Sequence, residues 1–444
     1  MTQAPVPVLS ESTEALCAAL MLAIPLAAAG LALTHAGLGR SRSAAQAMVS
    51  AVCVTATAAL AYFVCGWSWQ GYPGQPAHVF TVAGKAWNWI GAEPFFLAGL
   101  GYDGSRAALT VCLQMFSVCL AALIPLGSGS DRWRLGASCA STALLAGWTY
   151  PWFAHWVWGG GWLAQLGVNQ GWGYGFLDVG GAGTIQSVGG LTALSIALIV
   201  GPRHGKYAAD GMPSAIPGHN VVLVLFACFL TWVGWIGLNG SGCILRTGCS
   251  AAGVALVAIN TTLAAAAGAL AAACITRIRF GKPDASFSAN GWTGGLVASS
   301  AACVFLNPAS AAITGALAGV LITFSVEWLD ARFGVDDPAG SISVHAVGGL
   351  WGLLALGFFA RIPQDWARHG TGASDSNQWL AQLVGIVTLV GFVLPLTYSL
   401  NWLLNRFCPQ RVSDEGEADG LDLYELGAGA YPEFVIHRED LRPR

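Results

Sequence analysis

Apolar stretches long enough to cross a lipid bilayer recur along almost the whole chain, and this pattern limits what the chain can fold into. A membrane-spanning helix needs about 20 mostly apolar residues. Only 10% of the 444 residues are charged, whereas roughly a quarter are charged in an average soluble domain. The sequence therefore predicts an all-α polytopic membrane protein. Its net charge of −3 is small and argues against nucleic acid as a partner.

Eleven transmembrane helices are predicted, and this odd number places the two termini on opposite sides of the membrane. No basic segment precedes the first span, so we expect a membrane helix there rather than a cleaved signal peptide. Residues 1–407 then form one transmembrane domain, and the polar, acidic residues 408–444 form a cytosolic tail. The spans cover residues 14–35, 45–69, 107–127, 136–158, 185–200, 220–238, 252–275, 293–305, 311–329, 343–360 and 381–407.

Basic residues are concentrated in alternate loops, which predicts the orientation of the chain in the membrane. Because basic residues favour the cytoplasmic side, we expect the N-terminus outside and the C-terminus inside the cell (inner) membrane. One set of loops contains Arg40, Arg42, Arg132, Arg134, Arg203, Lys206, Arg277, Arg279, Lys282 and Arg332. The other set contains only Lys85, Arg106, Arg246, Arg361 and Arg368.

Two short stretches echo each other half a chain apart. TIQSVGGLTAL (184–194) and SVHAVGGLWGL (343–353) keep Val-Gly-Gly-Leu in register, which pairs Gln186 with His345. Five spans separate the two copies, so the halves have opposite orientations in the membrane. This predicts an inverted repeat of residues 14–200 and 220–360, followed by helix eleven at 381–407, with a binding site between the halves.

The paired polar residues are candidates for a pathway through the membrane. His345 lies inside a predicted span, where a polar side chain usually faces a cavity or a pore. It could instead tie two helices together by a hydrogen bond, and its pairing with Gln186 favours pore lining. Glutamine accepts or donates hydrogen bonds but, unlike histidine, does not relay protons near neutral pH.

Three other features next to the spans have both structural and functional interpretations. Asp178 precedes span five, where it would cap a helix and help a cation to approach. Trp158 lies beside three glycines, and a tryptophan there belongs to an interfacial belt or forms a cation–π site. Cys243 and Cys249 flank ILRTG in a predicted loop, where a disulfide forms if that loop faces an oxidising compartment.

Longer motifs make the pattern specific. In chain order they are HWVWGGGWLAQLG (155–167), GPRHGKY (201–207), GWIGLNGSG (234–242), FGKPDASFSANGWTGGLV (280–297), VDDP (335–338) and GLDLYELGAGAY (420–431). This series resembles the Amt/Mep/Rh family of ammonium transporters, in its microbial Amt branch, over essentially the whole chain. The resemblance implies eleven helices, a pseudo-twofold between the first five and the next five, and a homotrimer with one pore per subunit.

The resemblance also assigns roles to three residues that follow the family pattern. Trp158 falls on the tryptophan of the outer vestibule, which recruits ammonium. Asp178 falls on the aspartate before span five. His345 falls on the second of two pore histidines, which the family is thought to use to strip and relay a proton.

Several positions depart from the family pattern. Gln186 stands at the first pore histidine. Ser117 stands at one phenylalanine of the gate, with Phe116 adjacent if the register shifts by one, and Leu238 stands at the other. Gly242 stands where the recruiting serine is expected, with Ser241 next to it. The fold implied by the resemblance is therefore kept, while its selectivity residues are partly replaced.

Three hypotheses follow for function, and an enzyme is not among them because no nucleophile–base pair or metal-ligand cluster is present in the sequence. The first is transport of ammonium or ammonia with altered or lost proton coupling. The second is an ammonium sensor that signals through the tail to a partner, for which the resemblance implies a PII-type regulatory protein. The third is a channel for another small amine, amide or neutral solute. No cofactor or metal is expected.

Overall fold

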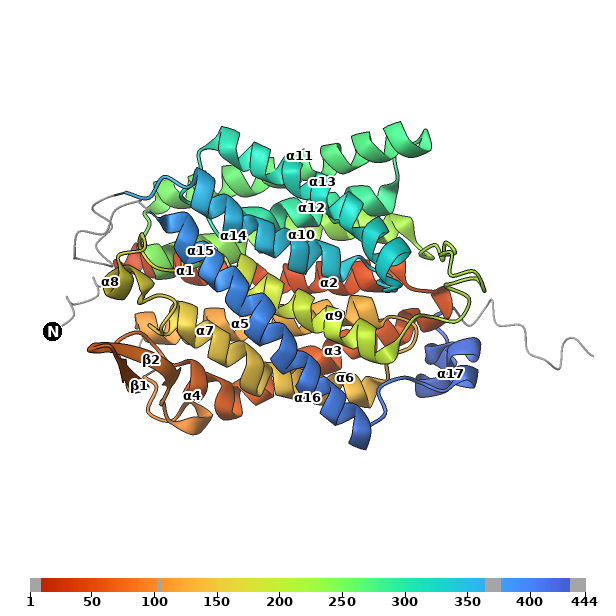
Figure 1. The fold of residues 1–444 in the computed structure, drawn as a ribbon, viewed down its shortest axis with the longest axis horizontal. Helices are drawn as coiled ribbons and strands as arrows, with labels where there is room; N and C mark the ends of the chain where they lie inside the picture. Colours follow the sequence, from red (N-terminus) through yellow and green to blue (C-terminus); the bar gives the residue numbers. More distant parts are fainter. Residues whose placement is uncertain (1–8, 102–104, 364–376, 432–444) are drawn as a thin grey trace, which may run out of the picture.

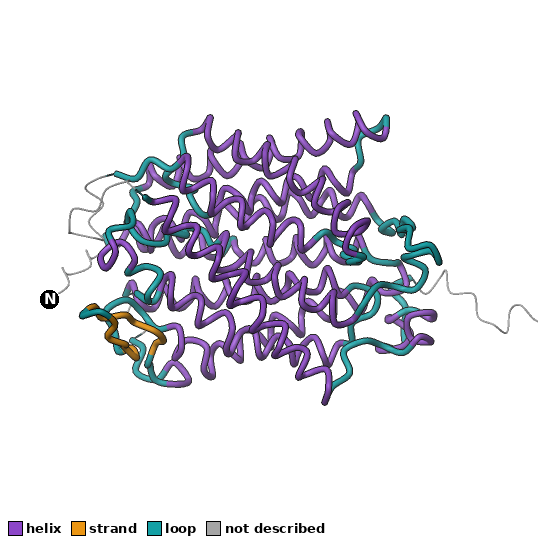
Figure 2. Tube along the Cα trace, in the orientation of Figure 1, coloured by secondary structure: helices purple, strands orange, loops and turns teal. Residues whose placement is uncertain are grey.

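The computed structural model describes residues 9–101, 105–363 and 377–431, in which the chain forms a bundle of long helices (Figures 1 and 2). In this part of the chain nine helices are long and apolar enough to cross a membrane. Two further helical segments, residues 135–158 and Ala285–Ser300, overlap the predicted fourth and eighth spans. The all-α polytopic prediction is confirmed. The nine long apolar helices of the described residues are Glu11–Leu38, Ser41–Gln70, Arg106–Gly129, Ala182–Val200, Val221–Thr247, Ala251–Phe280, Pro308–Phe333, Ile342–Phe359 and Gln378–Phe407.

Several spans consist of two helices joined by a short break or a π-helical turn. The α-helices of the first half are α1 (Glu11–Met21), α2 (Ile24–Leu38), α3 (Ala44–Ala61), α4 (Trp67–Gln70), α5 (Arg106–Gly129), α6 (Leu135–Leu144), α7 (Tyr150–Trp158), α8 (Leu166–Gln170) and α9 (Val188–Val200). Those of the second half are α10 (Val221–Gly242), α11 (Ala251–Phe280), α12 (Ala285–Ser300), α13 (Pro308–Phe333), α14 (Gly348–Phe359), α15 (Gln378–Thr388), α16 (Leu394–Phe407) and α17 (Asp414–Asp419).

The two ends of the bundle differ, and Figure 1 shows both. The end that carries the two-stranded sheet β1 (Ala77–Val82) and β2 (Lys85–Gly91) is called the hairpin end. The strands are antiparallel, with Ala77 opposite Gly91 and Val82 opposite Lys85. The opposite end carries α17 and is called the tail end. Helix α1 begins at the hairpin end and α16 finishes at the tail end, as an odd number of crossings requires.

The echoing motifs pack against each other reciprocally. Each begins with a π-helical turn, η5 (Ala182–Ser187) before α9 and η7 (Ile342–Val347) before α14. A Cβ on Gly190 would lie 2.3 Å from the backbone nitrogen of Ala346, and one on Gly349 would lie 2.4 Å from the hydroxyl of Ser187. Because Ser187 and Ala346 occupy matching positions, the glycine of each motif approaches the same position of the other motif. Both glycines let backbones approach closely.

Two aspartates stand eight residues before Gln186 and His345 and extend this repeat. Asp178 accepts hydrogen bonds from the backbone of Gly181, Gly183 and Thr184 and from the hydroxyl of Thr184, at 2.8–3.0 Å. Asp337 accepts from the backbone nitrogens of residues 341 and 342 and from the hydroxyl of Ser128. Each carboxylate therefore satisfies the free N–H groups at the start of its helix. The predicted capping role of Asp178 is confirmed.

A buried charge cluster joins three loops at the tail end. Asp336 accepts from Nε and Nη2 of Arg203 at 2.9 and 3.0 Å, and Asp131 accepts from Nη1 of Arg203 at 3.0 Å. Burial alone would raise the pKa of Asp336, but the guanidinium groups of Arg132 and Arg203 hold that pKa below its usual value. The cluster fixes the loops that precede α6, α10 and α14.

The C-terminal tail lies against these loops through its acidic side chains. Asp422 accepts from the backbone nitrogens of residues 45 and 46, at the start of α3. Glu425 accepts from the backbone nitrogen of Leu135, at the start of α6. Glu417 accepts from the backbone of His204 and pairs with Arg411 at 2.7 Å. Tail carboxylates thus cap two membrane helices, and residues 432–444 of the predicted tail lie outside the described residues.

Two predicted boundaries are wrong. The predicted loop after Cys243 is the π-helical turn η6 (Cys243–Thr247), which continues α10 without a break. The eighth span was predicted to end at Phe305, whereas α12 ends at Ser300 and begins earlier, at Ala285. Residues 301–306 leave the helix, and their carbonyls bond to Val179 and to Asn260. Irregular backbone inside the bundle is tolerated because other parts of the protein satisfy its polar groups.

Candidate functional site

Gln186 and His345 meet in the interior of the bundle, as their positions in the repeat predict. The Nδ1 of His345 lies 2.7 Å from the Oε1 of Gln186, and the two side chains are 2% and 0% exposed. In this geometry Nδ1–H donates to the amide oxygen, which leaves Nε2 of the imidazole as an acceptor. The Nε2 amide of Gln186 is buried and has no hydrogen-bond partner among the described residues. The pair therefore presents one unused donor and one acceptor.

Trp158 and Asp178 lie together towards the hairpin end. The indole Nε1 of Trp158 donates to the backbone carbonyl of Asp178 at 2.8 Å. The next two backbone nitrogens, of Val179 and Gly180, donate to the carbonyls of Ala301 and Ser300 at the broken end of α12. The hydrogen bond fixes the orientation of the Trp158 ring beside the segment that leads into η5.

The face of Trp158 is already covered by a cation of the same chain. The guanidinium carbon of Arg246 lies 3.6 Å from the centroid of the Trp158 ring, and Arg246 is 6% exposed. Nη1 of Arg246 donates to the carbonyl of Val179, and Nη2 has no hydrogen-bond partner in the described part of the chain. Arg246 was predicted only as a loop charge, so this contact was missed from the sequence.

Gly242 provides the space that Arg246 occupies. A Cβ at this position would lie 2.6 Å from the Val179 carbonyl and 2.8 Å from Nη1 of Arg246. Ser241, the neighbouring candidate for recruitment, donates its hydroxyl to the carbonyls of residues 237 and 238 in its own helix. Leu238 is fully buried in the core. The structure thus brings Trp158, Asp178 and Gly242 together around Arg246.

The candidate gate residues on α5 differ in burial. Ser117 is fully buried and donates to the carbonyl of Leu113 at 2.7 Å, while Phe116 is half-buried against the core. Tyr150 on α7 lies close to Ser117 and donates to Gln114 at 3.1 Å. The buried candidate on α5 is therefore the serine, and the hydroxyl of Tyr150 lies beside it.

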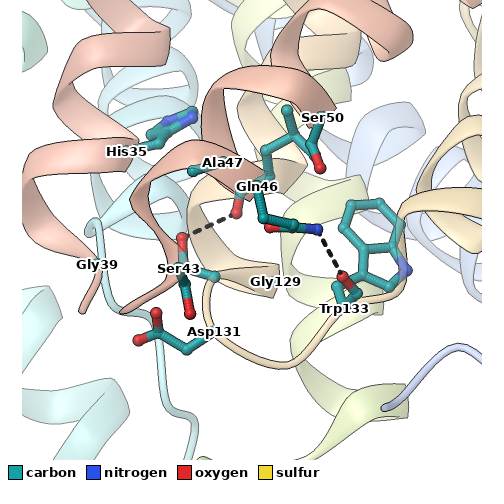
Figure 3. Close-up of a pocket in the computed structure, with 11 residues that line it drawn as sticks. His35, Gly39, Ser43, Gln46, Ala47, Ser50, Gly129, Asp131 and Trp133 are labelled. Carbon is teal, nitrogen blue, oxygen red and sulfur yellow. Dashed lines mark hydrogen bonds between the residues drawn. The ribbon is translucent and has the colours of Figure 1, made fainter. Parts of the chain in front are cut away.

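A small cavity lies at the tail end, lined by residues of α2, α3, the end of α5 and the loop after α5 (Figure 3). Its volume is about 20 Å³, which suits about one water molecule. His35, Gln46, Asp131 and Trp133 are among its lining residues, and Gln46 donates to the carbonyl of Trp133 at 3.4 Å and to Glu425 of the tail at 3.0 Å. The cavity therefore lies between the tail and the interior.

His35 was missed because it stands at the end of a predicted span. It is 3% exposed within α2, and its Nδ1 has no partner among the described residues. A Cβ on Gly127 would lie 2.8 Å from His35 and 2.2 Å from the hydroxyl of Ser341, four residues before His345. His35 therefore lies beside the start of the helix that carries the interior histidine.

A disulfide joins the first residue of η6 to a cysteine just beyond its end. Cys243 and Cys249 form a disulfide across six residues, and Arg246 lies between them in sequence. The pairing that the sequence left open is therefore made in the structure. Arg106 at the start of α5 donates to the carbonyl of Leu245 and holds the same segment. Arg368 of the predicted loop charges lies outside the described residues.

Comparison with known proteins identifies the family. The model of the Ammonium Transporter Family matches residues 15–431. The chain belongs to the ammonium transporter family. The chain is 36% identical to the ammonium transporter Amt2 of Archaeoglobus fulgidus, over 93% of this chain and 86% of that protein. It is 31% identical to the ammonium transporter of Bacillus subtilis, over 91% of this chain and 95% of that protein.

Solved structures of the ammonium transporter family have the same fold. The chain matches a protein named Sensor Amt Protein with a TM-score of 0.81 and 27% identity, over 93% of this chain and 98% of that chain. Mep2 of Candida albicans matches with a TM-score of 0.78 and 23% identity, over 98% and 93% of the two chains. The resemblance found in the sequence is confirmed at the level of family and fold.

Proposed function

We propose that this family member conducts neutral ammonia through a pore past Gln186 and His345, without relaying a proton. The 2.7 Å contact between these two side chains carries the proposal. Ammonia has one lone pair and three N–H groups, whereas ammonium has only N–H groups. The free Gln186 amide donates to a lone pair, and Nε2 of His345 accepts an N–H. The pair therefore complements ammonia.

A single imidazole beside an amide does not form a proton relay. Protonation of His345 would place a charge in a fully buried site whose partner, Gln186, does not take up a proton near neutral pH. A chain of proton transfers needs a second titratable group at that distance, and the amide supplies none. Transport is then uncoupled from proton movement and produces no sustained current.

The test uses proteoliposomes and two measurements on the same protein. An ammonium gradient should produce a rapid internal pH change, and recordings on a solid-supported membrane should show no sustained ammonium-evoked current. His345→Ala should alter the flux without creating a current. A robust current in the wild type that His345→Ala abolishes would overturn the uncoupled mechanism, and the absence of flux would overturn transport itself.

We propose that the hairpin end faces the outside and the tail end the cytoplasm of the cell (inner) membrane. The basic loops at the tail end support this orientation, because positive residues favour the cytoplasmic side. The Cys243–Cys249 disulfide on the opposite end supports it too, because disulfides persist in oxidising compartments. The family resemblance supports a homotrimer, with one such pore in each subunit.

A second candidate function is ammonium sensing with little transport, signalled through the tail. It is favoured by the capping of α3 and α6 by Asp422 and Glu425, and by the likeness to the protein named Sensor Amt Protein. Sensing predicts that ammonium changes hydrogen exchange in residues 414–431 while flux is negligible, and that a PII-type regulatory protein binds the tail end. Flux at rates usual for transporters would contradict it.

A further inference from the structure

We propose that Arg246 is a built-in cation that occupies the cation–π face of Trp158 and excludes ammonium from it, so that the vestibule admits only neutral molecules with a lone pair. This specificity-determining role rests on the proposed function, because it selects the species that reaches Gln186 and His345. Its foundation is the guanidinium 3.6 Å from the ring centroid, an ordinary cation–π distance.

The local sequence is arranged around this contact. Gly242 removes the side chain that would collide with Nη1 of Arg246, and the carbonyl of Val179 accepts a hydrogen bond from that nitrogen. The π-helical turn η6 aims Arg246 inward from the end of α10. The backbone of η6 and the absence of a side chain at residue 242 therefore place Arg246 inside the protein, where it is 6% exposed.

A disulfide and a hydrogen bond hold the backbone on either side of Arg246. The disulfide joins Cys243 to Cys249, and the guanidinium of Arg106 donates to the carbonyl of Leu245. Thr247 also donates to the carbonyl of Cys243 at 2.7 Å. A long, flexible side chain loses less entropy on binding when its backbone is already fixed. These bonds therefore favour a bound position of the Arg246 guanidinium on the face of the Trp158 ring.

The charges at this site leave no net attraction for a second cation. Asp178 lies within electrostatic range of Arg246, so the fixed positive charge is already balanced. With Asp178 already paired electrostatically with the guanidinium, a second cation at this site finds no net attraction, and the ring face that would bind it is occupied. In contrast, Nη2 of Arg246 is a buried donor with no partner among the described residues. A lone pair satisfies it, and ammonium has none.

Buried hydrogen-bond donors without a partner among the described residues occur at two levels of the proposed ammonia pathway. Nη2 of Arg246 stands towards the hairpin end and Nε2 of Gln186 stands deeper, and neither offers an acceptor to an ammonium ion. Ammonium must lose its proton to water before it passes Arg246. The proton stays on the hairpin side, which agrees with the uncoupled transport proposed above.

Binding to the purified full-length protein tests this role without a transport assay. The probes are guanidinium and methylammonium chloride at millimolar concentration, measured by calorimetry and by thermal shift. Arg246→Ala should bind both cations at least tenfold more tightly than the wild type does, because the ring of Trp158 becomes free. Adding Trp158→Leu should remove the new binding, and Arg246→Lys should resemble the wild type.

Arg406→Ala is the matched control, since its guanidinium lies 4.6 Å from the ring centroid of exposed Trp402 at the tail end. This variant should gain no cation binding. If Arg246→Ala does not fold, Arg246→Gln serves instead, because glutamine is neutral and too short to cover the ring. A folded Arg246→Ala or Arg246→Gln variant that binds cations no better than the wild type would overturn the proposal. Absence of ammonia flux would overturn only the proposed transport, since cation binding is measured separately.

Discussion

Gln186 and His345, 159 residues apart in sequence, share a hydrogen bond of 2.7 Å at matching positions of two inverted halves. The amide therefore stands where a second imidazole would complete a pair of titratable groups. Because glutamine is close to histidine in reach, we expect the site to accept histidine at position 186. The identity of one side chain then decides whether a proton can cross at this level.

Gln186→His should make transport electrogenic, whereas the wild type should transport ammonia without a sustained current. Two neutral imidazoles in contact form a short relay, since each accepts and donates a proton. A sustained ammonium-evoked current should appear on solid-supported membranes, at least several-fold above the wild-type signal. Gln186→Met, which has similar length but no polar group, should show no current. A silent Gln186→His variant that still folds and conducts ammonia would contradict the relay argument.

The paired glycines of the repeat should be intolerant of any side chain. In Gly190→Ala the new Cβ would lie 2.3 Å from a backbone nitrogen, and in Gly349→Ala 2.4 Å from a backbone carbonyl. Backbone atoms do not move aside as a flexible side chain does, so each change should cost about 3 kcal/mol or prevent assembly. Gly136→Ala, with nothing within 4 Å of its Cβ, should fold normally. Detergent-based thermal unfolding and yield of folded protein measure the difference.

The sequence predicted the elements that the bilayer dictates. Each predicted span overlaps a helical segment, although the eighth has different bounds, because an apolar segment in lipid must satisfy its backbone groups within a helix. The repeat placed Gln186 beside His345, since a pseudo-twofold brings matching positions together. Residues 77–91 were not predicted as strands, although alternating residues around Ala83-Gly84 match the hairpin that forms there.

Arg246 shows why the rest of the site could not be predicted in the same way. A basic residue near the end of a span is typical of a loop, and its burial depends on a cavity made by other segments. The signals were present as a glycine at 242 and two cysteines bracketing the arginine. These residues indicate a buried arginine only once the positions of Val179 and Trp158, which contact Arg246, are known. Long-range packing of this kind leaves no periodicity in the sequence.

Arg203→Ala should destabilise the protein far more than removal of an exposed ion pair. It leaves the carboxylates of Asp131 and Asp336 without their shared partner, at a cost of about 3–5 kcal/mol. Arg279→Ala, which breaks a partly exposed pair with Glu327, should cost under about 1 kcal/mol. Thermal unfolding in one detergent compares the two variants. Equal losses would show that burial of the cluster is not decisive.

Asp422→Asn should loosen the tail without disrupting the membrane helices. The neutral amide keeps an oxygen acceptor but loses the charge that favours the N-terminus of α3. Hydrogen exchange in residues 414–431 should rise several-fold while α3 stays protected. Asp419→Asn is the matched control, since Asp419 is exposed. Unchanged exchange in Asp422→Asn would place the docking energy elsewhere in the tail.

Deprotonation of Asp337 should lower the free energy of unfolding as the pH rises through the weakly acidic range. Burial raises the pKa of Asp337 from 3.8 to about 6, against the opposing effect of hydrogen bonds from Ser128 and from the backbone of residues 341 and 342. Between these values the folded protein binds more protons than the unfolded chain, so stability decreases with pH and levels off above about 6. A shift of this size corresponds to a linked change of up to about 3 kcal/mol. Asp337→Asn should lack it, so the melting temperature of the variant minus that of the wild type should increase between pH 4 and 7. Parallel profiles would contradict the linkage.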